Sequence, residues 1–239
     1  MSATAPYRPW IDHYPEGIEW DVPINTTPVH EQVLAACDLD PSATALDFLG
    51  GTTSFGSLKS QIQAFAGALQ HQYGVTKGSR VALLLPNTPF FPVAYFAVLL
   101  CGGTVVNCNP LYSVRELSHI TSHAGADLLI TLDLNIIYEK AEALQAAGHI
   151  KKMIVCHFPE ALPTVKKILF SIVKRSELAS MPASTVWFKD LIGAGHKVEA
   201  ARIDPEKDIA VQQYTGGTTG LPKGALLTHA NIAANVDQI

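Results

Sequence analysis

The sequence has few features that would cross-link the chain or direct it out of the cell. It contains only four cysteines, and none of them forms a Cys-x-x-Cys pair: Cys37, Cys101, Cys108 and Cys156. Three of them lie in apolar runs, where a free cysteine behaves as a small hydrophobic side chain, so we interpret all four as reduced core residues. The N-terminus has no apolar stretch of the secretory kind. Both absences favour a cytoplasmic protein.

The sequence also has neither a large excess of charge of one sign nor a long uninterrupted apolar run. The formal net charge is −4 at pH 7, so the chain has no overall basic field that would favour nucleic acid as a partner. No charged residue occurs between Arg80 and Arg115, but prolines, glycines and asparagines interrupt this stretch. Its longest clean apolar run, 93–101, is well short of the roughly 20 residues that a membrane-spanning helix needs. A strand, a buried helix and a second strand explain the stretch better.

What the chain does contain is the composition of a globular protein: 239 residues, of which 48% are hydrophobic and 16% charged. Short apolar runs alternate with segments of helical periodicity, which predicts an α/β fold with a parallel sheet covered by helices on both faces. The expected strands lie at 43–49, 80–85, 104–106, 127–131, 152–156 and 208–213. The expected helices start at Pro28 (capped by Thr27) and at Ser113 (with a capping box), and others cover 58–69, 90–101, 134–147 and 231–239.

The segment from Tyr214 to Gly224, with the sequence YTGGTTGLPKG, carries the strongest functional signal. It follows an apolar strand, and its glycines let backbone N–H groups converge on an anion. Its threonines add hydroxyl donors, and Lys223 adds a positive charge on a flexible stem, so the segment suits a polyphosphate. The order of residues matches neither the Walker A loop nor the dinucleotide-binding pattern. On physical grounds alone, a Gly/Thr-rich turn between two strands is the alternative.

The same segment resembles the signature loop of the adenylate-forming superfamily, Tyr/Phe-Thr-Ser-Gly-Thr-Thr-Gly-x-Pro-Lys-Gly. That superfamily includes acyl-CoA synthetases, firefly-type luciferases and peptide-synthetase adenylation domains. The sequence departs from the pattern at Gly216, where serine is usual, and thereby lacks one hydroxyl donor. The Gly-Gly form resembles the fatty-acyl-CoA ligase branch. Other segments similar to that branch are 10–15, 85–87, 105–107, 109–112 and 115–117, followed by His119.

The resemblance implies that residues 1–239 are the N-terminal part of the large domain of an acyl-CoA synthetase, an incomplete AMP-binding domain without the C-terminal domain. We divide it into an N-terminal arm (1–40), a first α/β subdomain (41–156), an amphipathic insertion (157–203) and a phosphate-loop region (204–239). The adenine contacts, most of the acyl tunnel and the C-terminal domain would lie past Ile239. The last helical segment also lacks a stop signal, so we expect a truncated chain that is inactive alone.

The implied reaction has two steps. A fatty acid attacks ATP, accompanied by Mg²⁺, to give an acyl-adenylate and pyrophosphate, and coenzyme A then displaces AMP to give a thioester. The expected catalytic residues are Lys223 and Thr215, because positioned donors and a lysine stabilise the charge that develops on pyrophosphate. No residue is assigned as a metal ligand. The expected phosphate-binding residues are Thr215, Gly216, Gly217, Thr218, Thr219, Gly220 and Lys223.

Two alternative functions stay open. One is another adenylating ligase, which acts on an aromatic acid or acylates a carrier protein. The other is a nucleotide-binding or interaction module without catalysis of its own. The residues that would separate the two kinds of ligase are expected beyond Ile239.

Two further patterns carry weaker hypotheses. His119 and His123 are four residues apart on a helix, the spacing of a two-ligand metal face, but no acidic or cysteine partner accompanies them, which favours a solvent-facing or hydrogen-bonded pair. The segment 163–175 suits peripheral contact with anionic lipid at the inner membrane face, a partner groove, or docking on its own domain. Its apolar stripe consists of Val165, Ile168, Leu169, Ile172 and Val173. A homodimer is left open as well.

Overall fold

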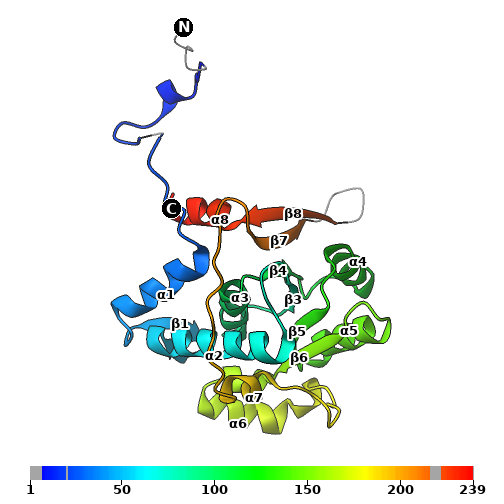
Figure 1. The fold of residues 1–239 in the computed structure, drawn as a ribbon. Helices are drawn as coiled ribbons and strands as arrows, with labels where there is room; N and C mark the ends of the chain where they lie inside the picture. The colour runs from blue at the N-terminus through cyan, green and yellow to red at the C-terminus, as the bar shows by residue number, and fades with distance from the viewer. Residues whose placement is uncertain (1–6, 20, 216–221, 239) are drawn as a thin grey trace.

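The computed structural model describes residues 7–19, 21–215 and 222–238, and a six-stranded sheet lies at its centre (Figure 1). The first five strands in spatial order run parallel, and the sixth pairs antiparallel with the fifth. In that order they are β6 (Lys152–Cys156), β5 (Leu128–Leu132), β3 (Arg80–Leu84), β4 (Thr104–Asn107), β7 (Ile209–Thr215) and β8 (Lys223–Thr228). The predicted α/β fold with a mainly parallel sheet is confirmed.

Helices cover both faces of this sheet, as strands that are apolar on both sides require. The chain moves in opposite directions along the sheet after β3 and after β4, so right-handed crossovers place the following helices on opposite faces. One face carries α3 (Phe90–Leu100), and the other carries α4 (Val114–Ala124) and α5 (Asn135–Ala146). α1 (Val29–Leu39) and α2 (Phe55–Tyr73) pack beside α3 (Figure 1). Between these layers every residue of β5 is buried.

Helix α4 is fixed at both ends by local signals. At its start, Ser113 Oγ accepts from the N–H of Glu116 at 3.3 Å, and Glu116 Oε2 accepts from the N–H of Ser113 at 2.8 Å, which is the predicted capping box. At its end, Gly125 adopts the left-handed conformation with φ 68°, which a side chain would disfavour. The side chains that α4 buries against the domain are Leu117, Ile120, Thr121 and Ala124. The helix is therefore a short, well-anchored support.

An antiparallel hairpin beside the main sheet was only half predicted. β1 (Thr44–Phe48) coincides with the expected strand at 43–49, but β2 (Gly51–Ser54) was not expected. The turn between them requires Gly50 at φ 87°. β2 escaped prediction because its residues, Gly-Thr-Thr-Ser, show no alternation of apolar and polar side chains.

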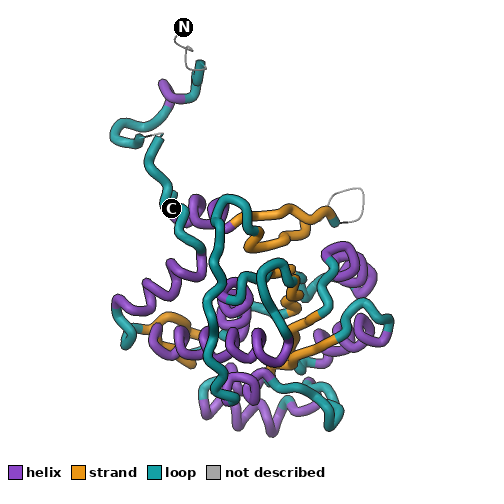
Figure 2. Tube along the Cα trace, in the orientation of Figure 1, coloured by secondary structure: helices purple, strands orange, loops and turns teal. Residues whose placement is uncertain are grey.

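The long connection from β6 to β7 passes over α2 before it joins the sheet beside β4 (Figure 2). It contains η2 (Phe158–Ala161), α6 (Thr164–Val173), η3 (Arg175–Glu177) and α7 (Phe188–Gly193). The Gln70 side chain exchanges two hydrogen bonds with the backbone of Glu199, at 2.6 and 2.9 Å. A Cβ on Gly67 would lie 2.1 Å from the carbonyl oxygen of His196, so only glycine lets the connection pass this close to α2.

The N-terminal helix begins one residue later than predicted, and the prediction of Thr27 as its cap was wrong. Pro28 is the N-cap of α1, and its side chain has no group that could cap the helix. The N–H of Val29 donates instead to Nδ1 of His229, 3.3 Å away and 200 positions along the chain. A local pattern cannot reveal a cap that comes from so distant a residue.

The helix that follows β8 also departs from the prediction. α8 (His229–Asp237) begins two residues before the expected helix at 231–239. Thr228 Oγ accepts from the N–H of Asn231 at 3.2 Å, and Asn231 Oδ1 accepts from the N–H of Thr228 at 3.0 Å. Asparagine closes this capping box in place of the glutamate or glutamine that identifies the motif in sequences, so the start of the helix was missed.

Candidate functional site

The motif that the sequence singled out surrounds the tip of the β7–β8 hairpin. Thr215, the last residue of β7, pairs with Lys223, the first residue of β8. The two expected catalytic residues are therefore neighbours across the base of the loop. The other expected phosphate-binding residues lie outside the described residues: Gly216, Gly217, Thr218, Thr219 and Gly220.

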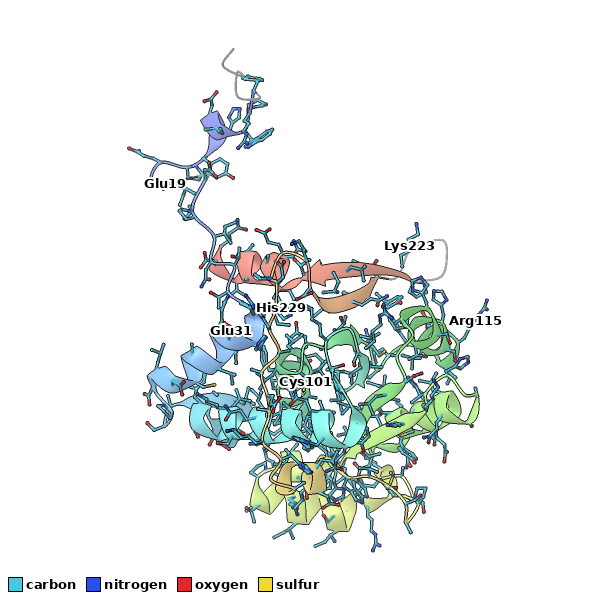
Figure 3. All side chains as sticks on the ribbon, in the orientation of Figure 1. Glu19, Glu31, Cys101, Arg115, Lys223 and His229 are labelled. Carbon is cyan, nitrogen blue, oxygen red and sulfur yellow. The ribbon has the colours of Figure 1, made fainter. Side chains whose placement is uncertain are left out.

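Thr215 and Lys223 are both exposed to solvent. Figure 3 shows the Lys223 side chain at the loop end of β8, pointing away from the sheet. Across the ranges that the structure describes, no carboxylate forms an ion pair with Lys223. Its positive charge is thus not neutralised by a described neighbour and is available to an anion at the tip.

Helix α4 contacts both sides of the loop through two histidines on one of its faces. His123 Nδ1 lies 2.6 Å from Oη of Tyr214, the residue before Thr215. His119 Nε2 lies 3.1 Å from the carbonyl oxygen of Pro222, the residue before Lys223. The two imidazole rings stack with their centroids 5.6 Å apart. The interpretation of these histidines as a hydrogen-bonded pair is confirmed.

Tyr214 is the buried link between the loop and the sheet. Its side chain is almost completely buried, and Gln212 Nε2 donates to its Oη at 2.8 Å. Gly224 lies opposite Tyr214 on β8, and a Cβ there would come within 3.0 Å of both Gln212 Nε2 and Tyr214 Cζ. The glycine therefore leaves the space that the tyrosine ring occupies. Burial raises the pKa of Tyr214 above its ordinary value, so the phenol remains a hydrogen-bond donor at neutral pH.

A cavity of about 420 Å³ opens at the carboxyl ends of β3, β4 and β7, next to the loop. The helices that follow β3 and β4 depart to opposite faces of the sheet, and in open α/β sheets ligands bind at such a point. Segments 85–87 and 109–112, which the family resemblance singled out separately, both line this cavity. The lining consists of residues 85–87, Phe91, 107–112 and Gln213.

The cavity lining is polar in part but carries no charged side chain. Asn107 Nδ2 donates to Oε1 of Gln213 at 3.0 Å, which joins the ends of β4 and β7. From outside the lining, Lys140 Nζ donates to the carbonyl oxygens of Pro110 and Tyr112 at 2.6 and 2.9 Å. Amides and apolar groups suit a neutral part of a ligand, and the Lys140 ammonium beside them is held by two carbonyl oxygens of the lining, whereas Lys223 at the loop has no carboxylate partner among the described residues.

Cys108 is the one thiol among the residues that line the cavity. Burial raises its pKa to about 12, so at neutral pH it stays protonated and is a poor nucleophile. Covalent catalysis through this cysteine is therefore not supported. All four cysteines are buried and free, as the sequence predicted.

The described residues offer no ready metal cluster. Within 7–19, 21–215 and 222–238, no group of three His, Cys, Asp or Glu side chains could hold a metal ion. In the same part of the chain, no helix combines the length and the apolar character that crossing a membrane requires. Of the residues that the structure describes at the hairpin tip, Lys223 offers a ligand its ammonium and Thr215 its hydroxyl.

Comparison with known families shows to which family the chain belongs. The family model described as AMP-binding enzyme matches residues 34–239, a range that includes both the hairpin and the cavity. The chain belongs to the AMP-binding enzyme family. The resemblance that rested on Tyr214 to Gly224 is thereby confirmed at the level of the family.

Relatives of this AMP-binding enzyme include long-chain-fatty-acid–CoA ligases of Bacillus subtilis (strain 168) and Escherichia coli O157:H7. Each is 34% identical, over 236 and 242 residues respectively and 96% of this chain. The crystal structure of a long-chain-fatty-acid–CoA ligase from Archaeoglobus fulgidus has the same fold, with a TM-score of 0.69, 23% identity and coverage of 90% of this chain and 39% of that one. The chain spans about two fifths of the length of the two curated relatives, 41% and 42%.

Sequence reasoning located the loop after β7 but missed what supports it. Tyr214 and Gly224 were parts of the motif without a role, and Gln212 and Gln213 were not connected to it. The ends of neighbouring parallel strands were the available signal for Gln213, because they converge on one edge of the sheet. The partnership of Gly224 with Tyr214 depends on the register of β8, a strand that the pattern did not predict. The roles of Thr215, Lys223 and the loop between them stay predictions.

Proposed function

We propose that the intact protein activates a fatty acid with ATP, first to an acyl-adenylate and then to a coenzyme A thioester. Both curated relatives are named long-chain-fatty-acid–CoA ligases. The observation that carries the proposal is the pairing of Thr215 with the unneutralised Lys223 at a hairpin tip beside an uncharged cavity. A triphosphate at the tip and a neutral group in the cavity would use both features.

In the first step, a carboxylate oxygen of the fatty acid forms a bond to the α-phosphorus of ATP. The bond from that phosphorus to the oxygen bridging to the β-phosphate breaks, and pyrophosphate leaves with the electron pair. We assign the Lys223 ammonium and the Thr215 hydroxyl to the stabilisation of this growing negative charge. The further donors would be Gly216, Gly217, Thr218, Thr219 and Gly220.

In the second step, the thiol sulfur of coenzyme A forms a bond to the acyl carbon, and the bond from that carbon to the oxygen of AMP breaks. Pyrophosphate has left by then, so the hairpin tip has no leaving phosphate to stabilise. The two half-reactions should therefore depend very differently on Lys223.

Magnesium would arrive with ATP. The hairpin tip offers hydroxyl and carbonyl oxygens but no carboxylate, since its described residues are Thr215, Pro222 and Lys223. In nucleotide sites Mg²⁺ is held mainly by phosphate oxygens and water with one or two protein carboxylates, so the described residues of the tip would leave the ion to the phosphates, with the neutral oxygens of Thr215 and Pro222 as neighbours. When bound, the ion would share in neutralising the phosphates, while Lys223 and Thr215 would orient them.

The test is to incubate the intact protein with ATP, magnesium, palmitate and coenzyme A, and to quantify pyrophosphate, AMP and palmitoyl-CoA. Parallel reactions contain benzoate in place of palmitate, or an acyl carrier protein in place of coenzyme A. We expect AMP and palmitoyl-CoA in equal amounts with palmitate. AMP formation with only benzoate or the carrier protein would point to another adenylating ligase, and ATP binding without AMP from any acid would point to a non-catalytic module.

We also propose that segment 163–175 contacts the inner, cytoplasmic face of a membrane, where the fatty acid dissolves. No residue of α6 is buried, and this exposure favours a contact beyond the described domain over docking of the stripe on it. The stripe is exposed at Val165 (78%), Ile168 (57%), Leu169 (58%), Ile172 (75%) and Val173 (66%). An apolar groove of about 430 Å³ runs along the helix, and Lys166, Lys174 and Glu177 are the charged residues in its lining. Lys167 and Arg175 follow Lys166 and Lys174 in the sequence and bring the basic residues of the segment to four. An apolar face with a basic border suits anionic lipid.

Vesicle co-sedimentation tests this contact. Each basic residue near an anionic surface contributes about 1 kcal/mol, screened by salt, so replacing the four by glutamine should weaken binding to anionic vesicles and reduce its salt dependence. A matched control replaces four basic residues of the same connection: Lys189, Lys197, Arg202 and Lys207. Equal binding by parent and variant would rule out a membrane contact and leave a protein partner. A homodimer stays a prediction, which sedimentation velocity would test.

A further inference from the structure

The two loop contacts of α4 have a common geometry. His123 reaches Tyr214, one residue before Thr215, and His119 reaches Pro222, one residue before Lys223. Residues four apart on a helix lie one above the other, and here their rings are stacked at 27°. One face of α4 therefore contacts the chain on both sides of the loop. Each contacted residue directly precedes a residue that we assign to phosphate: Tyr214 precedes Thr215, and Pro222 precedes Lys223.

The hydrogen-bond donors determine how each contact works. Gln212 Nε2 donates to the Tyr214 oxygen, and Nδ1 of His123 lies 2.6 Å from the same oxygen, so the phenol oxygen is held between an amide and an imidazole, whichever tautomer His123 adopts. The carbonyl of Pro222 can only accept, so His119 must donate from Nε2. One contact fixes the buried side chain of Tyr214, and the other fixes the backbone at Pro222. Both are made by residues outside the segment 216–221.

The support itself is well anchored. The capping box and Gly125 fix the two ends of α4, and its opposite face is buried in the domain. The hairpin, by contrast, forms the edge of the sheet and has only β7 bonded to β4. The contacts of α4 therefore add a second line of attachment, on the side of the hairpin where the loop begins and ends.

We propose that His119 and His123 are positioning residues that set the relative placement of Thr215 and Lys223 for the phosphates of ATP. The inference rests on the proposed function, since the phosphates are those of the adenylation step. Neither imidazole touches the reacting atoms: His123 acts through Tyr214, and His119 acts through the backbone of Pro222. A ligand that requires two separate groups at fixed spacing is sensitive to small displacements, and a misplacement of 1 Å can cost about 100-fold in rate.

The variants follow from the two contacts. His119→Ala removes the donor to Pro222, whereas His119→Gln keeps an N–H at a similar reach. Tyr214→Phe removes the hydroxyl that His123 contacts but keeps the ring over Gly224. The matched control is His149→Ala, because His149 bonds Ser122 of the same helix at 2.7 Å and has no contact with the hairpin among the described residues.

The measurement is made on the intact protein. ATP–pyrophosphate exchange reports kcat and KM for ATP in adenylation, and synthetic acyl-adenylate with coenzyme A reports the second half-reaction. For His119→Ala and Tyr214→Phe we expect kcat/KM for ATP to fall about 10- to 100-fold, with the second half-reaction nearly unchanged. The melting temperature should hardly change in His119→Ala and should fall in Tyr214→Phe, which leaves the buried Gln212 Nε2 without this acceptor. His119→Gln should recover most of the loss, and His149→Ala should behave like the parent.

Several outcomes would overturn the proposal. Unchanged adenylation in His119→Ala and Tyr214→Phe would show that α4 does not position the tip. Equal slowing of both half-reactions, or activity that follows the melting temperature with no recovery in His119→Gln, would show a purely structural role. If the parent adenylates no acid, the proposed function fails instead, and pyrophosphate binding to the same variants then tests the positioning role: equal affinity in all of them would end it.

Discussion

The β7–β8 hairpin is flanked by a pair of histidines at each end, and the two pairs are built in opposite ways. At the loop end, His119 and His123 are only partly covered, and each has a hydrogen-bond partner on the hairpin. At the other end, His30 and His229 are buried and pack edge to face at 5.6 Å. Figure 3 shows His229 beside α1, at the far end of β8 from Lys223. Neither ring nitrogen of His30 has a partner among the described residues.

The difference shows what each end contributes. A hydrogen-bonded imidazole near solvent fixes a direction at little cost, whereas a buried imidazole adds packing but leaves polar atoms unsatisfied. Burial, together with the neighbouring His229, lowers the pKa of His30 to about 4. Burial also lowers the pKa of His229 to about 4, although Asp208 acts in the opposite direction. The α8 end thus favours stability at neutral pH, whereas at the loop end both imidazoles are hydrogen-bonded to the hairpin, as we expect for a proposed phosphate site.

The largest effect we expect is acid destabilisation through the α8 end. Unfolded histidines bind protons near pH 6.5, but His30 and His229 in the folded state do so only near pH 4. Their contribution to stability is therefore complete above about pH 6.5 and is lost as the pH falls toward 4. At 1.4 kcal/mol per pH unit for each group, the pair should lose roughly 3 to 6 kcal/mol. Urea unfolding of the chain between pH 4 and 7.5 measures this.

Replacing His30 tests whether the His30–His229 pair causes the loss of stability in acid. His30→Leu removes one titrating group and two unsatisfied nitrogens, while the Val29 N–H keeps its acceptor on His229. The slope of stability against pH between 4.5 and 6 should fall by about 1.4 kcal/mol per unit. Thr228→Val supplies the control, because it changes a hydroxyl next to His229 and no titrating group, so the slope should stay the same. Equal slopes in the parent and His30→Leu would mean that the acid response originates elsewhere.

The next largest effect lies at the loop end. Lys223→Ala should slow adenylation by about 30- to 1,000-fold, because a charge-assisted contact to the leaving pyrophosphate contributes roughly 2 to 4 kcal/mol. Lys223 is exposed, so unfolding should change little. Lys207→Ala is the control, since Lys207 lies just before β7 and pairs with Asp204 at 2.9 Å. Single-turnover rates for both half-reactions decide: thioester formation that slows as much as adenylation would remove the assigned role.

Between the two ends, Gly224→Ala should affect both properties moderately. The new Cβ would lie 3.0 Å from Gln212 Nε2 and from the Tyr214 ring, so one of them must shift. Overpacking of this kind costs about 1 to 3 kcal/mol, and the shift should also weaken the Tyr214–His123 contact. Gly193→Ala is the matched control, because a Cβ there meets nothing within 4 Å. Full stability and full adenylation in Gly224→Ala would show that the tyrosine has room to move.

The sequence alone predicted the sheet and the hairpin tip because both depend on local signals. Five parallel strands are short apolar runs, and the loop is a continuous motif from Tyr214 to Gly224. The supports depend on residues far apart, and no local pattern predicts them: His229 caps α1 across 200 positions, and His123 meets Tyr214 across 91. The histidine spacing indicated a shared helix face, but the partners of that face follow only from the order of the strands.

The smallest and most direct test applies one substitution to both ends of the hairpin. Thr215→Val removes a hydroxyl assigned to phosphate, and a neutral hydrogen bond contributes about 0.5 to 1.5 kcal/mol, so adenylation should fall about 2- to 10-fold at unchanged stability. Thr228→Val removes the oxygen that caps α8, so unfolding should become easier by about 1 kcal/mol at unchanged adenylation. Each variant controls for the other, because valine replaces threonine at the end of a strand in both. Pyrophosphate exchange measures the adenylation rate, and urea unfolding measures the stability, of each of the two variants. If both variants lost activity and stability together, the hairpin would act as one unit, and the separation between its ligand end and its structural end would be wrong.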